Sequence, residues 1–197
     1  MDMPQVKVTR EDWLLAALAA LAATGVGGVS VDPLARRLGV TRGSFYWHFK
    51  DRAALLEEAL VLWEEQSTLG LIAELSELAD PRARLEALFY GALTDDTVAG
   101  LEPAIVAHAQ HPVVGAVLAR VTERRLDYLT GLFAELGLDE GAARRQAVAT
   151  YAAYLGWIEL RRAAPAIAPE TAATREEPAA AALAHLLAML TPVIPPD

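Results

Sequence analysis

The segment from Ser30 to Arg52 constrains the fold of this chain more than any other part of it. Its first half places apolar residues at the i, i+3, i+4 and i+7 positions of one helical stripe, namely Val31, Leu34, Ala35 and Leu38. We expect Ser30 to cap this helix and Gly39 to end it in the left-handed conformation. Thr41 is expected to cap a second, short helix over residues 42–48. Two helices joined by so tight a turn predict a helix-turn-helix, a motif that places its second helix in the DNA major groove.

The second helix of this motif carries aromatic residues on both sides. Drawn as a wheel at about 100° per residue, it places Phe45 and Phe49 on the inward face. Trp47 then points away from the core, and Tyr46 lies on the flank. A DNA surface explains outward aromatic side chains, because they can pack on the sugar-phosphate backbone. The alternative is that Tyr46 and Trp47 are core residues of an ordinary helix pair.

Small and basic residues around these aromatics suit contact with DNA. Gly43 allows the backbone to come close, while Arg42 and Ser44 can reach phosphates or base edges. Lys50 and Arg52 flank the start of the next helix, whose N-terminal amides also favour a phosphate. The motif therefore offers both non-specific and base-specific contacts.

The run GVTRGSFYWHFKDRAALLEEAL, which begins at Gly39, resembles the signature of the TetR family of transcriptional regulators. The shared features are a glycine–valine turn, a recognition helix ending in aromatic-Tyr-aromatic-His-Phe, then Lys-x-Arg and a Leu-Leu pair. The resemblance extends from about Trp13 to Leu60. It implies an all-helical dimer with an N-terminal DNA-binding domain and a C-terminal ligand-binding domain. It also implies DNA-contact roles for eight residues, which are Arg42, Gly43, Ser44, Tyr46, Trp47, His48, Lys50 and Arg52.

Charge and composition limit the possible functions. The 197 residues include no cysteine, which excludes a disulfide framework, a thiolate metal site and a catalytic cysteine. The formal net charge of −9 by itself argues against a DNA-binding protein. Residues 1–52, however, carry seven Lys or Arg against five acids, a net +2, so the remainder carries −11. A basic head on an acidic body can still dock on DNA head first, because local charge governs phosphate contact.

The chain is rich in alanine and leucine and has few strand-favouring runs, so we expect an all-α fold. Residues 1–52 would form a helix-turn-helix DNA-binding head of three helices, and residues 53–197 a ligand-binding and dimerisation domain. The first helix of the head is expected over 10–24, with Thr9 and Asp12 as a capping box. Further helices are expected over 52–78, 81–93, 102–110, 112–136, 140–163 and 175–190, with a loop at 95–100.

The last two long helices are the expected dimer contact. One offers an apolar face of Ala147, Tyr151, Tyr154, Leu155 and Ile158, and the other a face of Ala179, Leu183, Leu186, Leu187 and Leu190. Two such helices from each chain would form a four-helix bundle. The alternative is that both faces belong to the core of a single chain.

A helical body of this size can enclose an apolar cavity with a few polar groups. The candidate ligand-binding residues are Trp63, Phe89, Leu93, Ile105, His108, Tyr128, Tyr151 and Trp157. Plain core packing is the alternative for each of them. His108 and His111 have a metal-compatible spacing but lack a third ligand nearby. No Gly-rich phosphate loop or catalytic triad order stands out, so we expect no metal, no cofactor and no enzymatic activity.

These features predict a ligand-responsive transcriptional regulator, most simply a repressor. It would bind a palindromic operator as a homodimer and be released by a small apolar or amphipathic effector. The alternative is an all-helical small-molecule-binding or enzymatic protein whose head binds a protein partner, which would explain the acidic total charge. Glu11 and Asp12 precede the first apolar run, unlike in a signal peptide, and no uncharged stretch is a convincing span. We therefore expect a cytoplasmic protein without a membrane partner.

Overall fold

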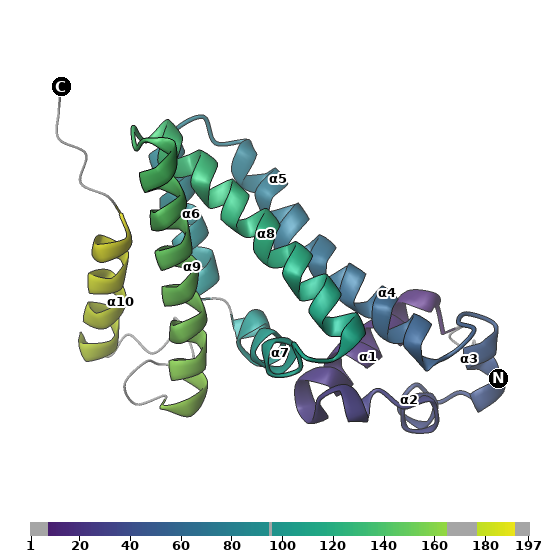
Figure 1. The fold of residues 1–197 in the computed structure, drawn as a ribbon. Coiled ribbons are helices and arrows are strands. Elements are labelled where there is room, and N and C mark those ends of the chain that lie inside the picture. Colours follow the sequence, from purple (N-terminus) through teal and green to yellow (C-terminus); the bar gives the residue numbers. More distant parts are fainter. Residues whose placement is uncertain (1–7, 95, 165–176, 192–197) are drawn as a thin grey trace, which may run out of the picture.

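The computed structural model describes residues 8–94, 96–164 and 177–191, which form helices joined by short loops, with no β-strand among them. Figure 1 shows two parts: short helices crowd together at one end of the molecule, and long helices extend away from them. The predicted all-α fold, with a helix-turn-helix head on a helical body, is confirmed.

The head begins with α1 (Arg10–Thr24) and a single 3₁₀ turn, η1 (Val26–Gly28). The helix-turn-helix follows as α2 (Val31–Arg37) and α3 (Arg42–Tyr46), and α3 ends slightly earlier than the sequence predicted. Gly39 lies in the turn between them with a φ of +70°, the left-handed conformation that glycine adopts without steric penalty.

The three N-caps expected in the head behave differently. The capping box of α1 is confirmed, because Thr9 Oγ1 accepts from the Asp12 amide at 3.2 Å and the Asp12 carboxylate accepts from the Thr9 amide at 2.7 Å. Ser30 and Thr41 occupy the N-cap positions of α2 and α3 as predicted, but neither makes a side-chain cap hydrogen bond. For Ser30 the third helical position is Pro33, which has no N–H to donate to a cap. The Ser30 hydroxyl instead donates to a carbonyl of η1 at 3.2 Å.

A single run of helix connects the head to the body. α4 (Arg52–Glu64) starts in the head after the cap residue Asp51 and continues through a π-helical segment, η2 (Glu65–Gly70), into α5 (Leu71–Ser76). Figure 1 shows this run rising from the head along one side of α8. The long helix expected here is confirmed in extent, but the π segment was not foreseen. Such segments are rare and occur frequently at functional sites.

Aromatic packing fixes the orientation of α3 in the head. Trp13 of α1 meets Phe45 edge to face, with ring centroids 5.5 Å apart, and Phe45 stacks on Phe49 at 5.6 Å. The guanidinium of Arg10 lies 4.4 Å from the Phe49 ring centroid and pairs with Glu58 of α4 at 2.5 Å. The end of the recognition helix is therefore held by both α1 and α4.

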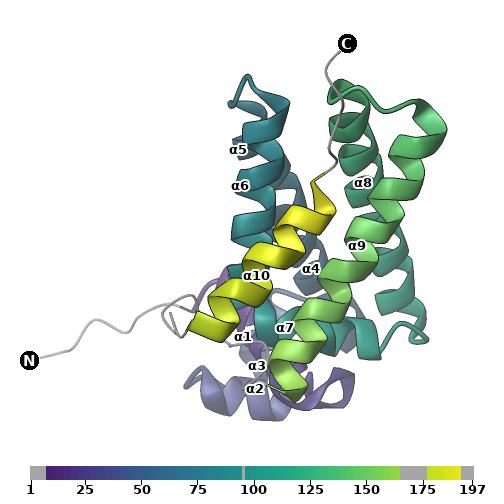
Figure 2. The ribbon, with the colours of Figure 1, turned by 90° about the vertical axis from the view of Figure 1, so that its left-hand side faces the viewer.

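The body comprises α6 (Pro81–Thr94), α7 (Asp96–Ala107), α8 (Pro112–Glu135), α9 (Glu140–Ala163) and α10 (Glu177–Leu190). α8 and α9 join at the end farthest from the head, and Figure 2 shows α10 crossing between α6 and α9. The loop expected at 95–100 is wrong, because α7 begins at Asp96 and continues through Pro103. α7 packs against α1, and such tertiary contacts stabilise a helix that local propensity does not favour.

Two hydrophobic cores lie along the molecule. The first joins the head to the near part of the body and includes Trp13, Leu21, Phe45, Leu60, Trp63, Ile105 and Val117. The second lies farther out and includes Leu85, Phe89, Leu132, Phe133, Ala147 and Tyr151. The first core contains residues from both sides of position 52, so the head and the body share one hydrophobic core there. The domain division at residues 52 and 53 stays a prediction.

The apolar face predicted for dimer contact on α9 is wrong in part. Ala147, Tyr151 and Ile158 are buried within their own chain, as is Leu190 on α10. Tyr154, Leu155 and Leu186 are half-buried, and the side chains of Ala179, Leu183 and Leu187 lie outside the described part of the structure. Helical periodicity identifies an apolar stripe but does not tell whether that stripe faces its own chain or a partner.

The length and hydropathy of each helix determine whether it could cross a bilayer. Within the described ranges, no single helix has the length and apolar character needed to cross a membrane. The segments Leu101–Ala107 and Pro112–Glu135 meet these requirements only when taken together, across a bend of 117°.

Candidate DNA-binding surface and ligand cavity

Two aromatic side chains point out of the head beside two that point into it. Trp47 is 88% exposed and Tyr46 is 54% exposed, whereas Phe45 and Phe49 are buried. These exposures agree with the helical wheel drawn from the sequence. Trp47 and Tyr46 thus form an exposed aromatic pair at the end of α3, on the side of the head opposite Phe45 and Phe49.

Arg42 lies at the N-terminal tip of α3. Its guanidinium donates to Asp32 of α2 at 3.2 Å and to the Tyr46 hydroxyl at 3.3 Å. The hydrogen bond that Arg42 donates to Tyr46 and the charge of Asp32 raise the pKa of Arg42, which stays charged. Gly43 is exposed and Ser44 is half-buried next to it. Arg42 is therefore held in place by exposed partners that a phosphate or a base can replace.

The basic residues after α3 differ in their surroundings. The Lys50 side chain is 82% exposed, with its ammonium 4.0 Å from the Asp51 carboxylate. Arg52 instead donates to the backbone carbonyls of Val26 in η1 and of Val29 directly after it. Its guanidinium is thus occupied within the head, while Lys50 extends toward solvent. His48 is half-buried, with its ring 6.3 Å from that of Phe49.

The body contains a cavity of about 280 Å³ enclosed by η2, α5, α6, α8, α9 and the end of α10. Its wall is mostly apolar and aromatic, and it includes Gln66, Ser67, Thr68, Leu71, Ile72, Glu74, Leu88, Phe89, Gly91, Ala92, Leu93, Arg125, Tyr128, Leu129, Thr150, Tyr151, Tyr154 and Leu190. Three of the residues in this wall belong to η2, the segment that continues α4. The same run of helix therefore begins at the head and forms part of the cavity.

Half of the predicted ligand-binding residues line this cavity, namely Phe89, Leu93, Tyr128 and Tyr151. The other half do not. Trp63 and Ile105 are buried in the first hydrophobic core, and His108 lies at the contact between α7 and the head. Trp157 donates its indole N–H to the carbonyl of Leu93 at 3.3 Å but does not line the cavity.

A buried polar network that the sequence did not reveal lies at the edge of the cavity. Arg125 of α8 donates to the Glu102 carboxylate of α7 at 2.5 Å, to Thr68 Oγ1 at 3.0 Å and to Ser67 Oγ at 3.2 Å. The Tyr154 hydroxyl of α9 donates to the second Glu102 oxygen at 3.0 Å. Burial is the largest single effect and lowers the pKa of Arg125, but the charge of Glu102, the two tyrosines Tyr154 and Tyr151 and the hydrogen bond to Glu102 together raise that pKa overall. Burial, followed by the charge of Glu102, raises the pKa of Tyr154.

One signal in the sequence points to this network. Glu102 is a single acid in the apolar run VAGLEPAIVA of α7, and it is fully buried. A buried carboxylate needs a cationic or hydrogen-bonding partner. Nothing in the sequence pattern identifies that partner as Arg125, which is 23 positions away on another helix.

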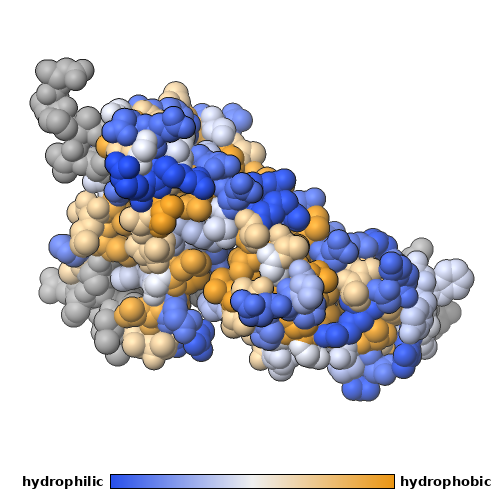
Figure 3. All heavy atoms as spheres, in the orientation of Figure 1, coloured by the Kyte–Doolittle hydropathy of each residue, from blue (hydrophilic) through white to orange (hydrophobic). Residues whose placement is uncertain are grey.

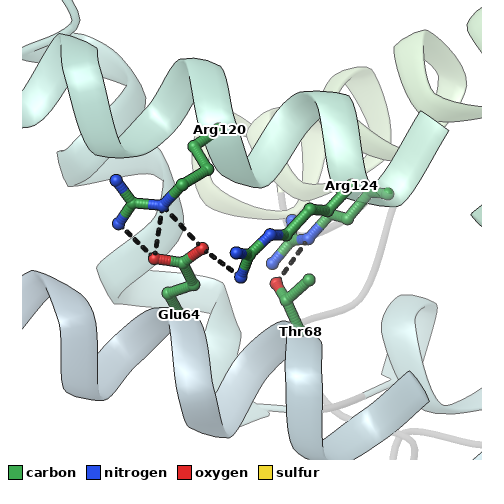
Figure 4. Close-up of polar contacts among 5 residues, drawn as sticks. Glu64, Thr68, Arg120 and Arg124 are labelled. Atoms are coloured by element: carbon green, nitrogen blue, oxygen red, sulfur yellow. Dashed lines mark hydrogen bonds and ion pairs between the residues drawn. The ribbon is translucent and has the colours of Figure 1, made fainter. Parts of the chain in front are cut away.

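A second ion cluster joins α4 to α8 one turn closer to the head. The Glu64 carboxylate, whose side chain is 4% exposed, accepts from Arg120 Nε at 3.0 Å and from Arg124 at 2.8 Å. Figure 4 shows Glu64 and Thr68 pointing up from one helix toward Arg120 and Arg124 on the other. The hydrogen bond from Arg120 lowers the pKa of Glu64 against the opposing effect of burial. The described residues hold no group of three or more acids or histidines able to bind a metal ion.

A helix-turn-helix head with outward aromatic residues is mounted on a helical body with an apolar cavity, so a surface suited to DNA and a cavity suited to a small molecule lie in separate parts of the molecule. The comparisons with known proteins agree. The sequence profile of bacterial regulatory proteins of the tetR family matches residues 14–59. The chain is 39% identical over 67 residues to the regulator AcrR of Shigella flexneri, which covers 34% of this chain and 30% of AcrR.

Two further comparisons extend this picture. The chain is 33% identical over 98 residues to the regulator BetI of Pectobacterium carotovorum, covering 47% of this chain and 50% of BetI. It is 38% identical over 55 residues to the class D tetracycline repressor of Escherichia coli, covering 28% of this chain and 25% of the repressor. The chain therefore spans half or less of the length of each of these relatives.

Solved structures share the fold over almost the whole chain. A transcriptional regulator from Rhodococcus superposes with a TM-score of 0.73 at 24% identity, covering 93% of this chain and 96% of that protein. A TetR-family regulator from Agrobacterium tumefaciens gives a TM-score of 0.73 at 18% identity, covering 93% and 97%. Residues 14–59 therefore resemble the DNA-binding part of tetR-family regulators, as the sequence predicted, and the solved structures show that the whole chain shares their fold. AcrR, BetI and the Rhodococcus and Agrobacterium proteins are all described as transcriptional regulators.

Proposed function

We propose that this protein is a transcriptional repressor that binds a palindromic operator as a homodimer and is released by a small apolar or amphipathic effector. The observation that carries the proposal is Trp47, which is 88% exposed at the end of the recognition helix. Together with Tyr46 it forms an exposed aromatic pair at the DNA-facing end of the motif, which a sugar-phosphate backbone can cover.

The surroundings of Trp47 support DNA over a protein partner. Lys50 and Arg42 flank it with exposed positive charge, and Arg42 is held only by exposed groups. Phosphate contacts of this kind account for most of the affinity of DNA-binding proteins. Because the head carries a small positive excess and the body is acidic, the field of the protein favours approach to DNA with the head first.

Dimerisation would use the surface of α9 that its own chain leaves uncovered. Val148 and Leu160 on α9 are 50% and 43% exposed, and Met189 on α10 is 66% exposed. Figure 3 shows apolar side chains gathered over this side of the body. A two-fold contact here would hold two heads at a fixed spacing, and operator half-sites should be separated by about 34–36 Å or somewhat more.

The effector would act through the run of helix from α4 to α5. Its first turns lie in the head, and its π segment lines the cavity. A ligand that changes the position of Ser67 or Thr68 would shift α4 and the spacing of the two heads. Such coupling is a population shift, and it is typically worth about 1–3 kcal/mol.

A mobility-shift titration with DNA from upstream of the protein's own gene tests the proposal. We expect a discrete complex with two chains per symmetric site. Trp47→Ala should weaken it strongly, whereas Tyr90→Ala, which removes an exposed aromatic residue of the body, should not. A monomer footprinted on a single non-symmetric half-site would contradict the proposal. Complete lack of DNA binding would favour the alternative, a head that binds a protein partner.

A further inference from the structure

The wall of the cavity contains three buried hydroxyl groups without a hydrogen-bond partner within the usual distance among the described residues. One is the Tyr128 hydroxyl on α8, which interacts with the charge of Arg84. The other two are Thr150 Oγ1 and the Tyr151 hydroxyl, on neighbouring residues of α9. Thr150 is 2% exposed and Tyr151 is 7% exposed. A buried hydroxyl that makes no hydrogen bond is unfavourable, and in most proteins such groups find a partner. A ligand in the cavity can supply one, because both residues line it.

The charges around the cavity argue for a neutral ligand. Of the described residues that line it, only Arg125 and Glu74 are charged, and Glu74 is exposed. The positive charge of Arg125 is already balanced by Glu102 at 2.5 Å, which is fully buried. A ligand carboxylate would add an uncompensated negative charge beside Glu102, and a ligand ammonium would face Arg125. Either would leave an unbalanced charge in a buried place, which is strongly unfavourable.

The volume and the lining of the cavity further limit which ligands can bind. The volume of about 280 Å³ lies just below the range of about 300–1,000 Å³ for drug-sized ligands. The remaining wall is formed mainly by leucine, phenylalanine and tyrosine side chains, such as Leu71, Phe89 and Tyr128. We infer that the cavity binds a small, uncharged, mainly apolar molecule whose hydroxyl or carbonyl oxygen hydrogen-bonds to Thr150 and Tyr151. This inference rests on the proposed function, in which the cavity is the effector site.

Four probes that share one skeleton test the inference by calorimetry on the full chain without DNA, at pH 7. para-Butylphenol is neutral and has a hydroxyl group, butylbenzene has none, para-butylbenzoate is an anion and para-butylbenzylammonium is a cation. We expect the phenol to bind about tenfold or more tightly than any of the other three. Tighter or equal binding of the benzoate or the ammonium would overturn the assignment of a neutral ligand, as would the absence of binding by all four.

Two variants locate the hydrogen bonds. Thr150→Val and Tyr151→Phe should each lower phenol affinity by about tenfold and leave butylbenzene affinity unchanged. Thr130→Val is the matched control, because the Thr130 hydroxyl already bonds the Leu126 carbonyl at 2.6 Å and does not line the cavity. Equal losses for both probes would show that the variants disturb packing, and this would overturn the assigned contacts.

DNA plays no part in these titrations, so their outcome is separate from that of the operator-binding experiment. A protein that binds the phenol but no DNA would retain the ligand assignment and lose the proposed repressor function. A protein that binds its operator but none of the probes would lose only the ligand assignment.

Discussion

His108, the residue directly after α7, lies so close to Gly25 at the end of α1 that a Cβ atom added to Gly25 would come within 2.5 Å of His108 Cε1. The ring is held there by a hydrogen bond between Nδ1 and the Ala104 carbonyl, 2.8 Å apart. The sequence had suggested His108 as a ligand-binding residue, but its position makes it part of the contact between body and head. A movement of α7 would therefore change the packing of His108 against the end of α1.

Gly25→Ala should destabilise the protein. Gly25 has φ +71° and ψ −170°, a conformation nearly restricted to glycine, so the backbone alone should lower the free energy of unfolding by about 1–3 kcal/mol. The clash with His108 adds to this, and a His108→Ala change should relieve that part only. Denaturant unfolding measures both effects. Gly27→Ala is the control, because an added Cβ there meets nothing within 4 Å; equal effects at the two glycines would contradict the prediction.

Glu64→Gln should weaken the contact between α4 and α8. Losing a charged hydrogen-bond acceptor beside Arg120 and Arg124 should lower the free energy of unfolding by about 1.5–3 kcal/mol. Glu86→Gln is the control: its pair with Arg82 is exposed on both sides, so the loss should be within about 0.5 kcal/mol. Urea unfolding at pH 7 compares the two.

The same carboxylate should make stability depend on pH. The hydrogen bond from Arg120 lowers the pKa of Glu64 below its ordinary value of 4.5 in the folded state. A lowered pKa contributes stability that is fully present above the unfolded value and is lost as the pH falls through the folded value. The native protein should therefore lose more stability below about pH 4.5 than Glu64→Gln does. Parallel pH profiles for the two proteins would show that Glu64 does not cause the loss.

Lys50→Ala should weaken binding to every DNA sequence by a similar factor. The exposed ammonium suits a phosphate contact, and loss of one such contact should reduce the slope of log K against log salt by about one. Titrations at several salt concentrations measure that slope. Arg82→Ala, on the exposed face of α6, should leave it unchanged.

Arg42→Ala should change which operator bases are preferred. If Arg42 reads a guanine, discrimination at one or two positions should fall by about 1–3 kcal/mol, while other positions keep theirs. Binding to a set of single-base operator variants measures this effect. A uniform loss at all positions, like that for Lys50→Ala, would mean that Arg42 contacts only phosphate.

Operator DNA should weaken ligand binding by the same factor by which the ligand weakens operator binding. This reciprocity follows from linkage, and a factor of about 5–150 is typical of allosteric proteins. Calorimetry with and without operator tests it directly. Trp157 does not line the cavity, so Trp157→Phe should leave the ligand affinity nearly unchanged, unlike Tyr151→Phe. Equal ligand affinity with and without operator would rule out the coupling.

The helix-turn-helix could be predicted from the sequence because its signals are local. The stripe that includes Leu34 and Leu38, the turn glycine Gly39 and the spacing of Phe45 and Phe49 are all read within one short segment. Ser30 makes no cap hydrogen bond, because the third residue of the helix is Pro33, which has no N–H to donate. This reason is also local, but a search for cap residues alone does not consider it.

The cavity could be predicted only in part, because its wall is assembled from five helices and the π segment. Aromatic residues such as Trp63 and Tyr151 carry the same signal in sequence, yet one lies in a core and the other lines the cavity. The pairing of Arg125 with Glu102 depends on how α7 crosses α8. Such crossings are decided by packing over the whole body, and no periodicity within one helix encodes them.

The exposure of Trp47 gives the protein its own optical reporter. Of its four tryptophans, Trp13 and Trp63 are buried and Trp157 is half-buried, so Trp47 alone has its indole almost wholly in water. Water around an indole shifts its emission to longer wavelength, and a covering surface reverses that shift. Occupancy of the head can thus be followed from intrinsic fluorescence in the unlabelled chain, separately from Trp63 deep in the first core.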